Sequence, residues 1–214
     1  IADFALACVL QHALRLPDRR VRSPEGWRHV SAPALAGSTL GLFGFGGIGR
    51  ALAAKALALG LRVRALRASR VPLGMDGVEA ARDLADLLAT SDHLALVAPG
   101  TEATRHVINA ASLAHARPGL HLINVSRGSL VEQTDLVAAL DSGQLAYASL
   151  DVTEPEPLPA GHALYTHPRV YLSSHTCAIS PQVRAAVLEK FLRSLATWEG
   201  GGTPDDPVDF GRGY

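Results

Sequence analysis

A glycine-rich run is the sequence feature that most restricts how this chain can fold. Residues 44–49 read GFGGIG, at the end of an apolar stretch at 39–45 and at the start of an alanine- and leucine-rich stretch at 48–59. A strand that turns through such glycines into a helix is typical of a dinucleotide-binding unit, because glycine permits the tight turn and a close backbone approach to a pyrophosphate. A glycine-rich turn without a ligand is the alternative. The predicted phosphate-binding positions are Gly44, Gly46 and Gly49.

Short apolar runs alternate with helical patterns along the rest of the chain. The pattern predicts strands at 39–45, 62–66, 93–98, 121–126, 147–152 and 170–174. It predicts helices at 1–16, 48–59, 83–88, 132–140 and 181–198. Strands that alternate with helices at this spacing form parallel pairs through right-handed crossovers. We therefore predict an α/β fold with a Rossmann-type, doubly wound parallel sheet.

The composition argues against several classes of partner. Of the 214 residues, 20 are Lys or Arg and 20 are Asp or Glu, spread along the chain, so no basic surface for nucleic acid or an anionic membrane is expected. No apolar stretch approaches the about 20 residues that a membrane span needs, and no signal region is evident, so we expect a soluble, cytoplasmic protein. The two cysteines, Cys8 and Cys177, lack metal-site spacing, so we expect free thiols and no metal.

The residues after the second predicted strand bear on the choice between NAD and NADP. An NAD site places Asp or Glu about 20 residues beyond the glycine run, where the carboxylate binds the ribose hydroxyls. Arg67 stands there instead, followed closely by Ser69 and Arg70. Because a guanidinium pairs with a 2′-phosphate that a carboxylate would repel, we predict NADP, with NAD as the alternative. These arginines would have no ligand if they only form a solvated strand end.

Three polar residues each follow a predicted strand: Arg127, Glu156 and His175. Each alone has an ordinary structural role, such as a surface ion pair or a histidine at a strand end. Ligands of open α/β sheets bind at the carboxyl ends of the strands, where all three residues should meet. Their coincidence beside a dinucleotide loop indicates a catalytic group.

These motifs, in this order, resemble the D-isomer-specific 2-hydroxyacid dehydrogenase family. The resemblance rests on Gly26 and Trp27, the run LFGFGGIGR at 42–50, Ser91 and Asp92, Ala98 and Pro99, Thr101 and Thr104, INVSRG at 123–128, the stretch 151–157, and His175. It implies an oxidoreductase that transfers a hydride between NADP(H), or NAD(H), and a small 2-hydroxy or 2-keto acid. A cofactor-binding module without turnover, such as a redox sensor or dimerisation domain, is the alternative.

The resemblance also implies a role for each site residue. His175 would donate a proton to the substrate carbonyl, Glu156 would hydrogen-bond the imidazole and favour its protonated form, and Arg127 would bind the substrate carboxylate. Asp151 would face the nicotinamide amide. The further residues implied in cofactor binding are Gly47, Ile48, Ala98, Pro99, Thr104, Val125, Ser126, Arg127, Asp151 and His175.

The resemblance implies a division of the chain into three parts. Residues 1–17 would form an interdomain crossover helix, 18–178 the dinucleotide-binding domain, and 179–214 a helix and tail that return to a substrate domain. A further segment of roughly a hundred residues, an ordinary small-domain size, would precede Ile1. A homodimer is also expected. The sequence departs from the family at 176–180, where TCAIS replaces a glycine-rich stretch and Cys177 is interpreted as a small buried residue rather than a reactive thiol.

Overall fold

The computed structural model describes residues 1–69, 71–205 and 207, so the predicted cofactor residue Arg70 lies outside the described residues. The chain divides into two compact units, Ile1–His175 and Thr176–Tyr214. The sheet lies in the first unit and helix α6 lies in the second. The domain boundaries expected after residues 17 and 178 stay predictions.

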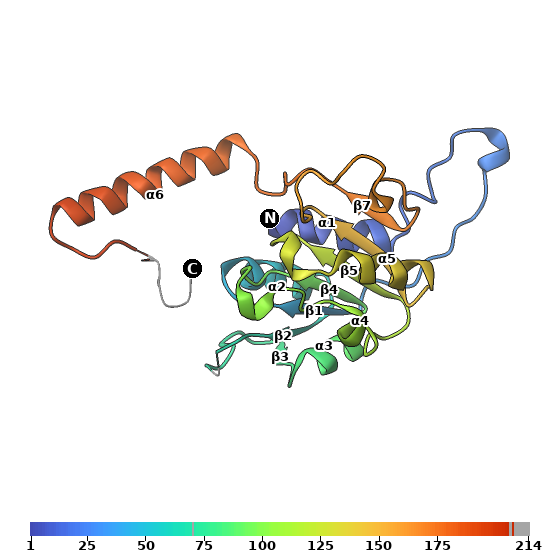
Figure 1. Ribbon diagram of the computed structural model, residues 1–214, viewed down its shortest axis with the longest axis horizontal. Coiled ribbons are helices and arrows are strands. Elements are labelled where there is room, and N and C mark those ends of the chain that lie inside the picture. The colour runs from blue at the N-terminus through green and yellow to red at the C-terminus, as the bar shows by residue number, and fades with distance from the viewer. Residues whose placement is uncertain (70, 206, 208–214) are drawn as a thin grey trace. The chain divides into compact units, whose positions relative to one another are not determined.

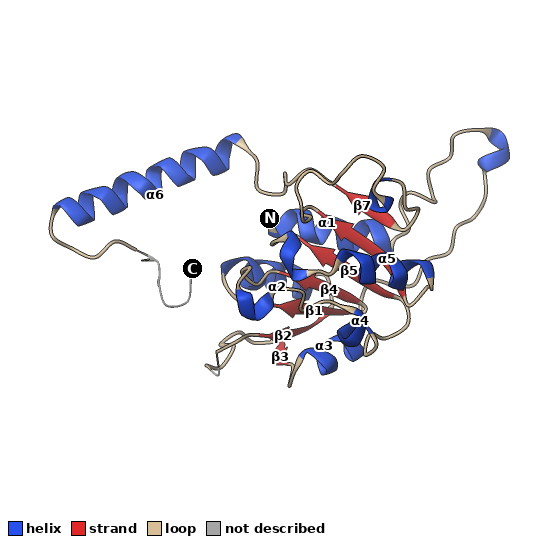
Figure 2. Ribbon diagram, viewed as in Figure 1, coloured by secondary structure: helices blue, strands red, loops and turns tan. Residues whose placement is uncertain are grey.

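A seven-stranded sheet forms the first unit, as Figure 2 shows in red. The strand order is β3-β2-β1-β4-β5-β6-β7, and every pairing is parallel. The order reverses between β1 and β4, which is where a doubly wound sheet opens a crevice for a ligand. This architecture confirms the predicted fold class. The strands are β1 (Thr39–Phe43), β2 (Arg62–Leu66), β3 (Val78–Ala80), β4 (His93–Leu96), β5 (Leu120–Asn124), β6 (Leu145–Leu150) and β7 (Val170–Leu172).

Helices cover both faces of the sheet (Figure 1). α1 packs against α2, while α3 contacts α4 and α4 contacts α5, and right-handed crossovers put these two groups on opposite faces. The helices are α1 (Ala2–Ala13), α2 (Gly47–Ala58), α3 (Leu84–Thr90), α4 (Ala110–Leu113), α5 (Gln133–Asp141) and α6 (Pro181–Glu199). Short 3₁₀ turns lie at Pro24–Gly26, Glu102–Thr104, Gly128–Leu130 and Ala163–Tyr165.

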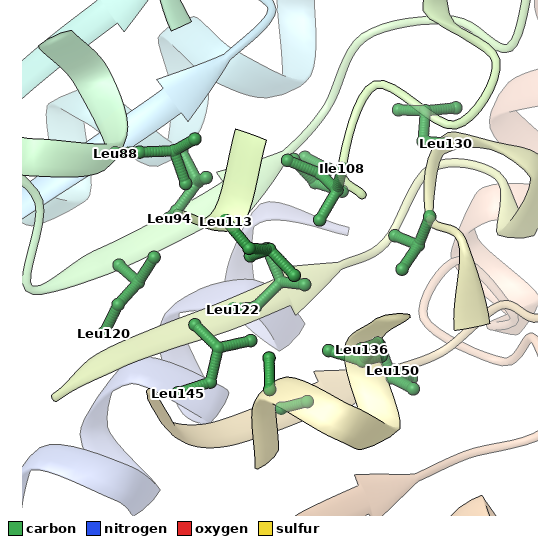
Figure 3. Packing of buried hydrophobic residues seen from close by; sticks show 14 of the residues in the cluster. Leu88, Leu94, Ile108, Leu113, Leu120, Leu122, Leu130, Leu136, Leu145 and Leu150 are labelled. Carbon is green, nitrogen blue, oxygen red and sulfur yellow. The ribbon is translucent and has the colours of Figure 1, made fainter. Parts of the chain in front are cut away.

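Leucines fill the space between the sheet and the group α3–α5 (Figure 3). Along each strand alternate residues point to this side, so β4, β5 and β6 each contribute leucines that meet leucines of the helices. This layer fixes the strands whose carboxyl ends carry the candidate site. The leucines at its centre, all at most 2% exposed, are Leu88, Leu94, Leu113, Leu122, Leu136 and Leu150.

The other face of the same strands carries a row of polar rings. His93 of β4 pairs in register with His121 of β5, and His121 pairs with Tyr147 of β6. The Nδ1 atoms of the two histidines lie 3.2 Å apart, and His121 Nε2 lies 2.9 Å from Ser149 Oγ. His12 of α1 stacks on Tyr147 with ring centroids 5.2 Å apart. We call His12, His93, His121 and Tyr147 the ring row; α1 packs on the sheet through it.

The ring row predicts a loss of stability in acid. Burial lowers the pKa of His93 to about 4 and holds the pKa of His121 well below its usual value, with His12 acting in the same direction. These pKa values lie below the value of about 6.5 in the unfolded chain. The free energy of unfolding that the two neutral histidines contribute is therefore complete above pH 6.5, and it is lost as the pH drops from 6.5 toward 4. His93 alone contributes about 3 kcal/mol to this loss.

Urea unfolding at a series of pH values measures this loss. His93→Gln keeps a hydrogen-bonding side chain but does not titrate, so its free energy of unfolding should depend less steeply on pH than that of the wild type. His115 is an exposed histidine, and His115→Gln serves as the matched control that keeps the wild-type slope. A His93→Gln slope equal to the wild-type slope contradicts the prediction.

Candidate active site

The predicted site residues gather at the carboxyl edge of the sheet. Gly44 follows β1, Ser126 follows β5, Asp151 follows β6 and His175 lies just beyond β7. The strands are parallel, so the loops after them share one edge. The structure therefore brings residues from distant parts of the sequence to one side of the molecule.

The glycine run fits a bound pyrophosphate. At Gly44 the backbone has φ 106°, and a Cβ there would lie 2.6 Å from the amide nitrogen of Ala98, so no other residue fits. A Cβ at Gly49 would lie 2.9 Å from the carbonyl oxygen of Gly44. At Gly46 and Gly47, by contrast, a Cβ would meet nothing within 4 Å. Open space therefore lies in front of the backbone at the start of α2.

The N-terminus of α2 has no side-chain cap among the described residues. The first amides of a helix have no partner within the helix, and the helix dipole favours an anion there. Ile48 supplies one of these amides, next to Gly47 and Gly49. The amides and the open space together suit the phosphates of a dinucleotide.

Two of the residues predicted to bind the 2′-phosphate follow β2 within the described part of the chain. There Arg67 forms no hydrogen bond or ion pair, and Ser69 Oγ is buried without a hydrogen-bond partner. A buried hydroxyl without a partner is costly, so together with the guanidinium two residues earlier in the chain it indicates a place for a polar ligand. The structure thus brings both side chains to the sheet edge that carries the glycine run.

His175 and Glu156 form a close pair. His175 Nδ1 lies 2.8 Å from Glu156 Oε2, and Glu156 Oε1 accepts a hydrogen bond of 3.0 Å from the backbone nitrogen of Thr153. The His175 backbone has φ 55° and donates to the carbonyl of Asp151 at 2.8 Å. With Nδ1 held by a carboxylate, Nε2 is the ring nitrogen that remains to exchange a proton with a ligand.

A cavity of about 770 Å³ adjoins this pair. His175, Glu156 and Asp151 line its polar part, and its apolar part is lined by residues of the connection between β6 and β7, such as Leu158, and by residues of β7, such as Leu172. This size suits a small ligand.

The loop that carries Arg127 is packed against the loop that carries Glu156. A Cβ at Gly128 would lie 2.0 Å from the carbonyl carbon of Thr153, so the two backbones touch and only glycine fits. Arg127 itself is exposed, and its Nη1 donates to the carbonyl of Ser126 at 2.7 Å. The sequence motif contains this glycine, but its contact with the second loop is visible only in three dimensions.

The remaining predicted cofactor residues join the loops after β4 and β5. Thr104 Oγ1 donates to the carbonyl of Pro99 at 2.8 Å, and Ser126 Oγ donates to the carbonyl of Ala98. Val125 is 4% exposed, between β5 and Ser126. The Ser126 contact holds the two loops together beside the glycine run, whereas the Thr104 contact lies within the loop after β4.

Asp151 is buried, and its Oδ1 accepts a hydrogen bond of 2.6 Å from Ser173 Oγ. The sequence patterns did not identify Ser173, whose position after β7 was the available signal. They also did not identify Arg50, which follows Gly49 directly and contacts the segment beyond β2. Through its hydrogen bond to Oδ1, Ser173 orients Asp151, a predicted site residue.

The two cysteines form no disulfide: Cys8 is buried, and Cys177 is partly exposed. Across the described ranges, no group of His, Cys, Asp and Glu side chains is arranged to hold a metal ion. The described helices include none that is long and apolar enough to cross a membrane.

Comparison with known proteins gives matches over nearly the whole chain. The family model described as D-isomer specific 2-hydroxyacid dehydrogenase, NAD binding domain, matches residues 4–177. The chain is 35% identical to glyoxylate/hydroxypyruvate reductase A of Serratia proteamaculans, over 99% of this chain and 68% of the relative. For two curated relatives the matched share of the relative is 62% and 68%, so the chain spans about two thirds of their length.

Solved structures with a bound nicotinamide cofactor are among those similar to this fold. A D-isomer specific 2-hydroxyacid dehydrogenase from Xanthobacter autotrophicus Py2, in complex with NADPH and MES, superposes with a TM-score of 0.89 at 36% identity, covering 100% of this chain and 88% of that chain. An NADPH-dependent glyoxylate/hydroxypyruvate reductase from Sinorhizobium meliloti, in complex with NADP and sulfate, has a TM-score of 0.91 at 30% identity, covering 100% and 69%.

Proposed function

The chain belongs to the D-isomer specific 2-hydroxyacid dehydrogenase family, a family of NAD(P)-dependent oxidoreductases, and we propose that it reduces a small 2-keto acid with NADPH. The observation that carries the proposal is the pair His175 and Glu156, 2.8 Å apart, beside a cavity at the sheet edge that also holds the glycine run. The substrate class follows the relatives named as glyoxylate or hydroxypyruvate reductases.

The roles of the site residues follow from their chemistry. Bound NADPH would supply a hydride to the carbonyl carbon of the keto acid. Protonated His175 gives the proton on Nε2 to the carbonyl oxygen and becomes neutral. Glu156 accepts a hydrogen bond from Nδ1 and so orients the imidazole with Nε2 toward the substrate. Arg127 pairs with the substrate carboxylate through two parallel hydrogen bonds and so orients the carbonyl.

The preference for NADP over NAD rests on the end of β2. Among the described residues, the Arg67 guanidinium has no ion-pair partner and the Ser69 hydroxyl has no hydrogen-bond partner, so both suit the added phosphate of NADP. Similar structures in complex with NADPH or NADP support the same choice. Arg70, outside the described residues, is the third residue predicted for this role.

Steady-state turnover tests the proposal. With NADPH the protein should reduce glyoxylate, hydroxypyruvate or phenylpyruvate, and kcat/KM should be about 10–100-fold lower with NADH, the loss expected for hydrogen bonds to a charged group. Acetoacetate, whose carbonyl lies one carbon further from the carboxylate, is the matched control and should not turn over. Equal turnover with NADH contradicts the cofactor preference. NADPH binding without turnover of any 2-keto acid favours the cofactor-binding module instead.

The homodimer and the cytoplasmic location stay predictions. The connector between α1 and β1 extends away from the sheet (Figure 1), and residues 15–29 are all exposed. Trp27 lies on this connector with 80% of its surface exposed. An aromatic side chain this exposed is compatible with burial against a second copy of the chain.

A further inference from the structure

Arg50 links two segments that the proposed function uses separately. It follows the last glycine of the run, on the first turn of α2. Its Nη2 donates to the carbonyl of Leu73 at 2.7 Å, and its Nη1 lies 3.3 Å from the carbonyl oxygen of Gly74. Its guanidinium carbon lies 4.9 Å from the ring centroid of Phe45, which belongs to the glycine run. One side chain therefore contacts both the phosphate turn and the segment after β2.

Both ends of this link are firmly placed. Phe45 is 4% exposed and Leu73 is 8% exposed, so two of the three contacts are made to buried residues, while Gly74 is exposed. The guanidinium has a cation–π contact on one side and two backbone carbonyls on the other. Lysine offers a point charge without the planar fork, so it cannot reproduce this arrangement.

The segment that Arg50 holds begins with the residues predicted to recognise NADP. Arg67 and Ser69 lie between the end of β2 and Leu73. A segment ordered before the ligand arrives binds it more tightly, because the entropy of ordering is not lost on binding. Only a cofactor that contacts this segment benefits from its order.

We propose that Arg50 is a positioning residue for NADP selectivity. It holds Leu73 and Gly74 against the glycine run, so that Arg67 and Ser69, a few residues earlier in the chain, are in place for the 2′-phosphate. The inference rests on the proposed preference for NADP, and it assigns to Arg50 no direct contact with that phosphate.

Dissociation constants of NADPH and NADH, measured by titration without substrate, test the inference. Arg50→Ala should raise the Kd of NADPH about tenfold and that of NADH less than about twofold, as expected when hydrogen bonds that order a segment are lost. Arg50→Lys should recover only part of the NADPH affinity. Arg62, exposed at the opposite end of β2, provides the control Arg62→Ala, which should leave both constants unchanged.

A double-mutant cycle separates positioning from direct binding. If Arg50 acts through Arg67, then Arg50→Ala should add little to the loss caused by Arg67→Ala, because the two changes remove the same interaction. Additive losses would mean that Arg50 contacts the phosphate itself, and they overturn the proposal. An equal rise in Kd for both cofactors would mean a general role in the fold and also overturns it.

Hydrogen exchange of the cofactor-free protein gives a second readout. Amides at 73–77 should exchange faster in Arg50→Ala than in the wild type, and unchanged exchange overturns the positioning role.

The proposed NADP preference and the proposed role of Arg50 are contradicted by different results. If the wild type binds NADPH no better than NADH, the proposed NADP preference is wrong, and the proposed role of Arg50 is wrong with it. If the wild type prefers NADPH and the Arg50→Ala variant keeps the same preference, only the proposed role of Arg50 is wrong.

Discussion

Asparagine in place of His175 should lower kcat for 2-keto acid reduction about 10²–10⁴-fold, the usual contribution of a positioned acid or base. The choice of asparagine follows from the backbone, which has φ 55° at this residue, a conformation that asparagine tolerates and alanine does not. Its amide can still hydrogen-bond Glu156, but it cannot exchange a proton at neutral pH. The loss should therefore report proton transfer rather than a change of fold.

A matched histidine provides the control for this experiment. His167 Nε2 lies 3.1 Å from Asp141 Oδ1, so it forms the same kind of histidine–carboxylate pair away from the cavity. His167→Asn should leave kcat within a few-fold of the wild type. The Kd of NADPH should change little in either variant. A His175→Asn protein with wild-type kcat would falsify the assignment of His175 as proton donor.

Removal of the Arg127 guanidinium should have the second largest effect. Arg127→Ala should lower kcat/KM for the keto acid about 10²–10³-fold, because a substrate carboxylate that loses its charged partner also loses its orientation. NADPH affinity should stay within a few-fold of the wild type, since the role proposed for the guanidinium is toward the substrate. Arg127→Lys should recover little, because lysine lacks the two parallel donors.

Arg105 is the control for Arg127. Its Nη1 lies 3.0 Å from Glu154 Oε1, and both side chains are more than 40% exposed. Exposed ion pairs of this kind contribute little, so Arg105→Ala should leave kcat/KM nearly unchanged. If the two alanine variants lose activity equally, the effect is one of surface charge and Arg127 has no specific role with substrate.

The central strands of the sheet could be predicted because they are buried on both faces. Runs such as 93–96 and 120–124 are buried throughout, and a short apolar run between helical patterns is typical of a strand in a parallel sheet. β3 was not predicted, since it has three residues, two of them exposed, and an edge position. A segment this short carries no periodicity.

The sequence predicted the edge of the sheet on which the site residues lie, but it could not predict how the side chains pair. Glu156 reaches His175 across 19 positions of the chain, through loops whose shape no pattern describes. The contacts of Arg50 could not be predicted from the sequence for a second reason. Their acceptors are the backbone carbonyls of Leu73 and Gly74, which every residue type possesses.

The ring row has a consequence for the folding of the sheet. On β4 and β5 the rings alternate with the leucines of the opposite face, so a shift of one residue in strand pairing would exchange the two sets. His121 would then enter a layer of leucines without its two hydrogen-bond partners, and Leu122 would replace it beneath α1. Such a misaligned sheet carries a large penalty, because buried polar groups without partners are expensive. The histidines thus discriminate against wrong alignments, which a sheet lined by aliphatic residues on both faces would tolerate.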